Sequence, residues 1–127
     1  KQWGELVNFA DVEEVELTQI PIRSSELKHL QSLSALKKLS LRSSSYKHGT
    51  LFGGNAIASL PDGIKELDLH GDNLSTSAVS HFAHLKELTH LDLQGTNIGR
   101  DGDADFSFLP ALTHLRLGIV TSETALS

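Results

Sequence analysis

Apolar residues recur along the chain in a fixed short pattern: apolar, two variable positions, apolar, one variable position, apolar. Copies of this pattern begin at positions 12, 36, 64, 88 and 112, so successive copies are 24, 28, 24 and 24 residues apart. The five copies are Val12-Val15-Leu17, Leu36-Leu39-Leu41, Ile64-Leu67-Leu69, Leu88-Leu91-Leu93 and Leu112-Leu115-Leu117. The last two apolar residues of each copy share one face of a short strand, because side chains alternate along strands. The regular spacing predicts a stack of five units.

A second spacing fills the stretches between the predicted strands. Counted back from the next copy, positions −9, −6 and −3 are apolar in the first and third units: Leu27, Leu30, Leu33, Val79, Phe82 and Leu85. This spacing predicts a helix in both units. In the fourth unit the Gly- and Asp-rich run 99–103 favours a shorter helix or a 3₁₀ turn. In the second unit, which carries four extra residues, we expect Leu51, Phe52 and Ile57 to fill the core in place of a regular helix.

The segments IKELDLHGDNLS at 64–75 and LTHLDLQGTNIG at 88–99 carry the pattern most completely. In these segments the chain resembles the leucine-rich repeat proteins, whose strand signature is Leu, two variable residues, Leu, one variable residue, Leu. The resemblance extends over nearly the whole chain. It implies an α/β fold, a right-handed solenoid with a five-stranded parallel concave sheet and helices or turns on the convex side. We expect residues 1–11 to be the helical half of an N-terminal repeat, capping or truncated, and residues 12–127 to form the solenoid.

One position departs from the common form of this family. Many members carry Asn or Cys three residues after the last strand Leu, whereas this chain has Ile20, Ser44, Asp72, Thr96 and Val120. The three middle residues can still form side-chain hydrogen bonds to loop backbone, and the outer two cannot. A continuous ladder of Asn side chains is therefore not expected.

Composition excludes several classes of function. The chain has 127 residues, with 11 Lys and Arg against 16 Asp and Glu, giving a net charge of −5, which argues against a nucleic-acid binder. It has no Cys, so disulfides, thiolate zinc sites and cysteine nucleophiles are excluded. No apolar run approaches the roughly 18 residues of a membrane span. Localisation stays open, with the cytoplasm slightly favoured. Because Met is absent, we expect a processed product or a piece of a longer protein.

The polar residues of each predicted strand should point away from the core and line the concave face of the sheet. We use the name concave face for three rows: Glu14, Lys38, Glu66, His90, His114; then Glu16, Ser40, Asp68, Asp92, Arg116; then Thr18, Arg42, His70, Gln94, Gly118. Neighbours in a row should be about 4.7–4.9 Å apart, the spacing of strands in a sheet. Lys38 should therefore pair across strands with Glu14 and Glu66.

The densest polar group on this face is Asp68 and Asp92, surrounded by His70, His90 and His114. Three interpretations stay open: ordinary solvated strand positions, a contact for a cationic group of a partner, or a His and carboxylate site for a divalent metal. We predict no bound metal and no cofactor. His81 and His84 form a His-x-x-His pair that we expect to face solvent on the convex side, because Phe82 and Leu85 face inward.

No pattern of a catalytic site is present. The chain lacks Gly-x-Ser-x-Gly and His-Glu-x-x-His, and Gly53-Gly54 lacks the rest of a phosphate-binding loop. We therefore predict a non-enzymatic module that binds a protein or peptide, and no nucleic acid, through the concave face. The residues predicted to bind the partner are Arg42, Glu66, Asp68, His70, His90, Asp92, His114 and Arg116, with Tyr46 and Lys47 on the second-unit loop.

Two alternatives remain from the sequence. The segment could be a structural spacer or cap in a larger protein such as a ligase, receptor or effector, or a small metal- or ligand-binding domain built on the His and Asp cluster. The sequence leaves the oligomeric state and the partner's identity open. Replacing Asp68 and Asp92 together by Ala is expected to leave the fold intact and to weaken partner binding.

Overall fold

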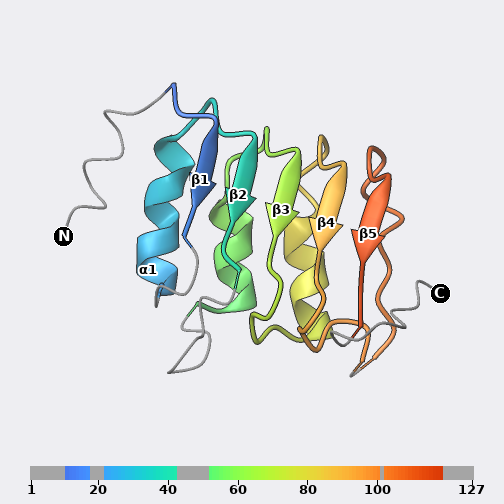
Figure 1. Ribbon diagram of the computed structural model, residues 1–127. Helices are drawn as coiled ribbons and strands as arrows, with labels where there is room; N and C mark the ends of the chain where they lie inside the picture. The colour runs from blue at the N-terminus through green and yellow to red at the C-terminus, as the bar shows by residue number, and fades with distance from the viewer. Residues whose placement is uncertain (1–10, 18–21, 43–51, 101, 119–127) are drawn as a thin grey trace.

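Five short parallel strands form one sheet in the order of the chain, as Figure 1 shows for the computed structural model. The structure describes residues 11–17, 22–42, 52–100 and 102–118. The strands are β1 (Glu14–Glu16), β2 (Lys38–Ser40), β3 (Glu66–Asp68), β4 (His90–Asp92) and β5 (His114–Arg116). Each begins two residues after the start of a copy of the sequence pattern, so the strand predictions are confirmed.

The register of the sheet places equivalent residues of successive units side by side. Val15 is paired with Leu39, Leu39 with Leu67, Leu67 with Leu91, and Leu91 with Leu115. A shift by one residue would turn every apolar strand residue to the outer face, so burial of these positions fixes the register. The predicted stacking of the repeat is therefore confirmed.

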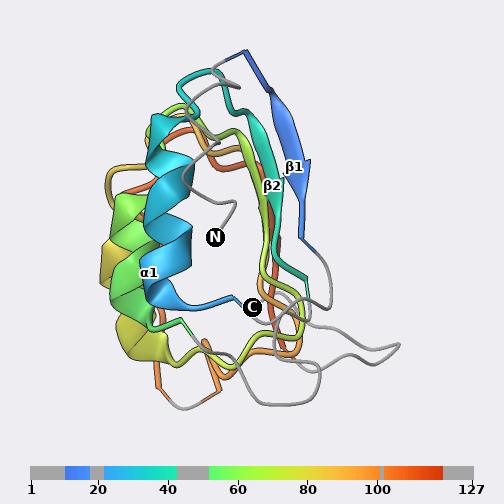
Figure 2. The same ribbon diagram turned by 90° about the vertical axis from the view of Figure 1, so that its left-hand side faces the viewer.

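Short helices form a second layer behind the sheet, as Figure 2 shows in side view. They are α1 (Ser24–Leu27), which continues into η2 (Lys28–Ser32), then η3 (Gly54–Ser59) and η4 (Thr76–Phe82). All but α1 are 3₁₀ helices. The prediction of helices in the first and third units is confirmed, but η3 shows that the second unit also has one. In the fourth unit, where a shorter helix or a 3₁₀ turn was predicted, the described residues form turns and no helix.

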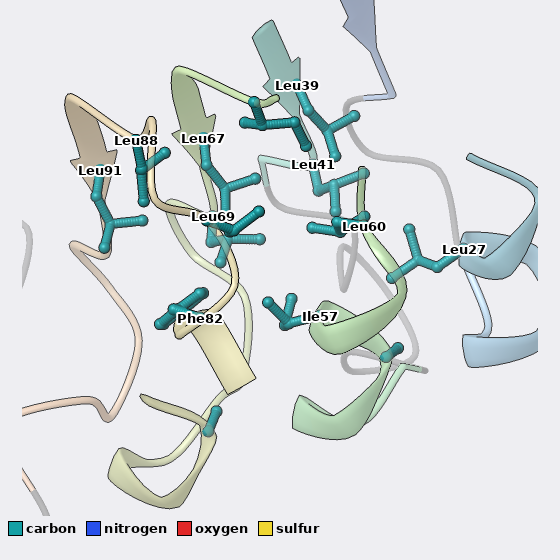
Figure 3. Close-up of a cluster of buried hydrophobic side chains, with 14 of the residues drawn as sticks. Leu27, Leu39, Leu41, Ile57, Leu60, Leu67, Leu69, Phe82, Leu88 and Leu91 are labelled. Atoms are coloured by element: carbon teal, nitrogen blue, oxygen red, sulfur yellow. The ribbon is translucent and has the colours of Figure 1, made fainter. Parts of the chain in front are cut away.

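The core lies between these two layers. Leu69, Phe82 and Ile57 are fully buried, and Figure 3 shows them between the strands and the 3₁₀ helices. Phe52 is buried as predicted, while Leu51 lies outside the described residues. Apolar residues of the outer units, among them Val15, Leu17, Leu115 and Leu117, are only partly buried. A repeat buries its apolar face against its neighbours, so the units with one described neighbour are the less covered ones.

The loops that leave the strands are held by backbone and side-chain hydrogen bonds. The buried Thr96 hydroxyl donates to the Leu93 carbonyl over 2.7 Å and accepts from the Ile98 N–H over 3.2 Å, as expected at this position. Asp72, its counterpart one unit earlier, is fully buried, while Ser44 lies outside the described residues. Gly71 and Gly95 adopt a φ of 81°, a left-handed conformation that other residues rarely adopt.

Substitution of Gly54 tests the contact between neighbouring 3₁₀ helices. A Cβ at Gly54 would lie 2.8 Å from the Ala78 Cβ of η4, so one of the two helices would have to move. We expect Gly54→Ala to lower the free energy of unfolding by about 1–3 kcal/mol, measured by urea denaturation. Gly53→Ala is the matched control, because its new Cβ would meet only the flexible Asn55 side chain. Equal stability of the two variants would contradict this packing.

Candidate functional site

The polar residues of the five strands line one side of the sheet, as predicted. A concavity on this side is lined by residues of all five strands, with Glu14, Lys38, Glu66, His90 and His114 following one another across the strands. The same concavity is bordered by Asp68, Asp92 and Arg116. The first two rows of the concave face therefore meet on one surface. In the third row, Thr18 lies outside the described residues, and the other four residues do not line the concavity: Arg42, His70, Gln94 and Gly118.

Lys38 sits between two carboxylates, as the alternation of charge predicts. Its Nζ lies 4.0 Å from Glu14 Oε2 and 3.8 Å from Glu66 Oε1. Lys38 and Glu66 are about half exposed, and Glu14 is more exposed than either. Ion pairs of this kind contribute at most about 1 kcal/mol each, so their main effect is on the surface charge of the concave face.

Arg42 is the shared partner of the two aspartates. Its Nε lies 3.0 Å from Asp68 Oδ2, and its second terminal nitrogen lies 3.6 Å from Asp92 Oδ2. His70 Nδ1 lies 3.8 Å from the same Asp92 oxygen. Arg42 follows β2 in the chain, and its guanidinium contacts Asp68 on β3 and Asp92 on β4. It therefore offsets the charge of both carboxylates.

The other oxygen of each aspartate binds backbone. Asp68 Oδ1 accepts from the His70 N–H, and Asp92 Oδ1 accepts from the Gln94 N–H, both over 3.0 Å. A side chain that accepts from the backbone two residues ahead forms an Asx turn, which here shapes the loop after the strand. This role was not predicted from the sequence, although the repeated Asp-Leu-x-Gly at 68–71 and 92–95 is its signal. Both aspartates are therefore engaged before any partner arrives.

His90 and His114 form a separate group. Their rings stack with centroids 4.1 Å apart and planes 8° from parallel. Nδ1 of each ring lies within hydrogen-bond distance of the preceding threonine hydroxyl: 2.8 Å from Thr89 and 2.9 Å from Thr113. Each hydroxyl also lies against a carbonyl of the preceding unit. The predicted cluster of two aspartates and three histidines is thus divided, with His70 beside the aspartates and His90 and His114 apart from them.

The two threonines that orient these rings were missed by the sequence analysis. The signal is the dipeptide Thr-His, which occurs at 89–90 and again at 113–114 in the same repeat position. Among the described residues, no group of three or more His, Asp or Glu side chains has the arrangement of a metal site. Arg116 makes no ion pair with the described part of the chain. Tyr46 and Lys47 lie outside the described residues.

The prediction for the His-x-x-His pair on the convex side is wrong for His84. Its Nε2 lies 2.9 Å from the Leu60 carbonyl, and the ring is partly buried. Leu60 follows the last residue of η3, and carbonyls at a helix end lack a partner within the helix. His84 of the next unit takes the place of that partner. His81 is also half-buried, whereas His29, at the same repeat position, is exposed.

Asp68 provides a test of the Asx turn. We expect Asp68→Ala to lower the free energy of unfolding by about 1–2 kcal/mol, because the His70 N–H loses its acceptor. Asp68→Asn keeps an oxygen at that place and loses the pair with the half-exposed Arg42 and the long hydrogen bond that Ser40 Oγ donates to Oδ2 over 3.4 Å, so its cost should be smaller. Both values come from urea denaturation. An equal loss in the two variants would mean that the charge, not the turn, carries the effect.

Comparison with known proteins finds a family match over part of the chain. The sequence profile of the leucine rich repeat family matches residues 62–118. No curated protein sequence matches the chain. In the described part of the chain, no helix has the length and apolar character needed to cross a bilayer.

Two solved structures share the fold. The tropomodulin C-terminal domain of Caenorhabditis elegans is 9% identical, with a TM-score of 0.62 over 97% of this chain and 85% of that one. Internalin C2 of Listeria monocytogenes is 17% identical, with a TM-score of 0.59 over 90% of this chain. The chain covers 55% of that internalin chain. Residues 62–118 thus match the leucine-rich repeat family, and the five in-register strands give the described chain the fold of leucine-rich repeat structures.

Proposed function

We propose that this chain is a non-catalytic interaction module that holds a protein or peptide on its concave face. The observation that carries the proposal is the row of outward polar side chains continued over all five strands, which together line a concavity. Leucine-rich repeat domains are in general protein-interaction modules, in keeping with this proposal. The residues proposed to contact the partner are those predicted from the sequence: Arg42, Glu66, Asp68, His70, His90, Asp92, His114 and Arg116, with Tyr46 and Lys47. Of these, Asp68 and Asp92 would meet the partner as carboxylates already paired with Arg42.

Rigid support of this surface favours binding. The strand residues that alternate with the polar positions, such as Leu39, Leu67 and Leu91, are almost fully buried. Backbone hydrogen bonds join each strand to the next in register. A surface that is already ordered loses little conformational entropy when a partner binds, so its contacts contribute more fully to affinity.

A selection experiment tests the proposal without a known partner. Peptides are selected from a random phage-displayed library on the intact chain, and their affinity is measured by calorimetry for the chain and its variants. We expect Glu66→Arg, which reverses a half-exposed charge in the middle of the concave face, to weaken binding at least about tenfold, or about 1.4 kcal/mol.

The matched control reverses a charge on the helical side. Lys28→Glu alters an exposed residue of η2 and should leave the affinity unchanged. If the selected peptides are insensitive to Glu66→Arg and lose affinity with Lys28→Glu, the helical side is the binding surface and the proposal fails.

A further inference from the structure

The end of the concave face at β4 and β5 has a composition of its own. It presents the stacked rings of His90 and His114 and the exposed guanidinium of Arg116. His114 and Arg116 are two residues apart on β5 and therefore point to the same side of the sheet. All three residues line the concavity.

The carboxylates near this end already have cationic neighbours. Glu66, which is paired in register with His90, lies 3.8 Å from Lys38. Asp92, which is paired in register with Arg116, has its Oδ2 directed toward Arg42 and His70. Arg116 is left without an ion pair in the described part of the chain, so the β5 end carries the positive charge that is still available.

The threonines set the direction of the imidazoles. Because Nδ1 of each ring is held by a hydroxyl, Nε2 lies on the opposite edge of the ring, turned away from that hydroxyl. Both rings are held at the same nitrogen by threonines in equivalent repeat positions, and their planes are 8° from parallel. When a ring is protonated, its Nε2 is a hydrogen-bond donor.

We propose that His90, His114 and Arg116 form a subsite for the carboxylate of an acidic side chain, aspartate or glutamate, of the protein partner. The proposal rests on the proposed function and names the chemistry of one contact. Two imidazole donors and a guanidinium supply charge-assisted hydrogen bonds to a group that has only acceptors. A bound anion also offsets the repulsion between the protonated rings of His90 and His114, whose centroids are 4.1 Å apart.

Affinity at this subsite should rise as the pH falls. An anion favours the protonated form of both rings, so binding takes up protons, and a lower pH favours the complex. The charged groups that share this end of the face are Glu66 on β3, Asp92 on β4 and Arg116 on β5. Glu66 lies 3.8 Å from Lys38 Nζ, and Asp92 Oδ2 lies 3.6 Å from the Arg42 guanidinium.

Titrations followed by NMR test the subsite directly. The probes are capped glycine peptides with one central glutamate, lysine or glutamine, together with inorganic phosphate. We expect saturable shifts of the His90 and His114 ring protons with the glutamate peptide, and an affinity about threefold or more higher at about pH 5.5 than at about pH 7.5. The lysine and glutamine peptides should cause no saturable shift.

Variants separate the roles of the residues. Arg116→Gln should weaken binding of the glutamate peptide about tenfold, while Lys28→Gln, a charge removal on η2, should not change it. Thr113→Val should weaken binding by releasing the His114 ring, and Thr113→Ser should restore it. A loss of affinity in Thr113→Val but not in Thr113→Ser, together with a change in the NMR shifts of the His114 ring nitrogens, would identify Thr113 as a positioning residue.

Several results would overturn the subsite. One is saturable binding of the lysine peptide, and another is binding of phosphate by a chain that does not bind the glutamate peptide. The others are weaker binding of the glutamate peptide at the lower pH, or no effect of Arg116→Gln on its affinity. If the glutamate peptide fails but library peptides still lose affinity with Glu66→Arg, the subsite is wrong and the proposed function stands. If the library peptides keep their affinity with Glu66→Arg and lose it with Lys28→Glu, the proposed function fails, whether or not the glutamate peptide binds.

Discussion

Leu67→Ala is expected to lower the free energy of unfolding by about 2–5 kcal/mol. Leu67 is 2% exposed and lies on the central strand β3, between Leu39 and Leu91 of the neighbouring strands. Its loss removes apolar contacts and leaves a cavity that two adjacent units border. The measurement is urea denaturation followed by circular dichroism. The slope of the unfolding free energy against urea concentration is compared with that of the unsubstituted chain, to detect any change in the surface exposed on unfolding.

Leu115→Ala is the matched control for this prediction. Leu115 occupies the same repeat position on β5 but is only partly buried, so the same truncation removes fewer contacts. We expect its cost to be clearly below that of Leu67→Ala. Equal costs would show that burial within the stack does not set the stability of a unit, which would contradict the nearest-neighbour description of repeat proteins.

The strands and their register could be predicted from the sequence because they depend on one strong signal. An apolar pattern repeated at near-constant spacing leaves few ways to bury Leu39, Leu67 and Leu91 together. Cross-strand neighbours follow directly from the register, and the pairing of Lys38 with Glu14 and Glu66 was found in this way.

Side-chain contacts that leave the register could not be predicted in the same way. Arg42 reaches past its neighbour on β3 to Asp92 on β4, which depends on the length and conformation of its side chain. From the sequence, Asp68 and Asp92 were therefore expected to be available to a cationic partner, whereas both already bind Arg42 and loop backbone. The Asp-Leu-x-Gly repeat was the available signal for the backbone part of this arrangement.

The spacing of apolar residues in the helical layer indicates the kind of helix only in part. Val79, Phe82 and Leu85 are spaced by three residues, as are Leu27, Leu30 and Leu33. A 3₁₀ helix has three residues per turn, so residues three apart lie on one line, whereas in an α-helix that line drifts around the axis. A spacing of three is therefore compatible with 3₁₀ geometry, which η4 adopts at Val79 and Phe82 and η2 at Leu30, whereas Leu27 lies in the α-helix α1. The spacing does not decide the kind of helix, because η3 is a 3₁₀ helix without three apolar residues at this spacing.

This geometry leads to the second prediction of large effect, for Phe82. The ring is fully buried at the end of η4 and lies between the sheet and the helical layer, as Figure 3 shows with Leu69 and Ile57 nearby. We expect Phe82→Ala to lower the free energy of unfolding by about 3–5 kcal/mol. The measurement is urea denaturation, with hydrogen exchange of the η4 amides to locate the loss.

Phe106 provides the comparison, since it lies at the same repeat position one unit later, where the described chain forms turns. It is only partly buried, so Phe106→Ala should cost less. The exchange data add a sharper distinction: Phe82→Ala should raise exchange in η4 and in the neighbouring η3, because these two helices pack together. Should Phe106→Ala cost as much as Phe82→Ala, the turn-containing unit would contribute as much to the core as the helical one, and the importance of η4 for stability would have to be rejected.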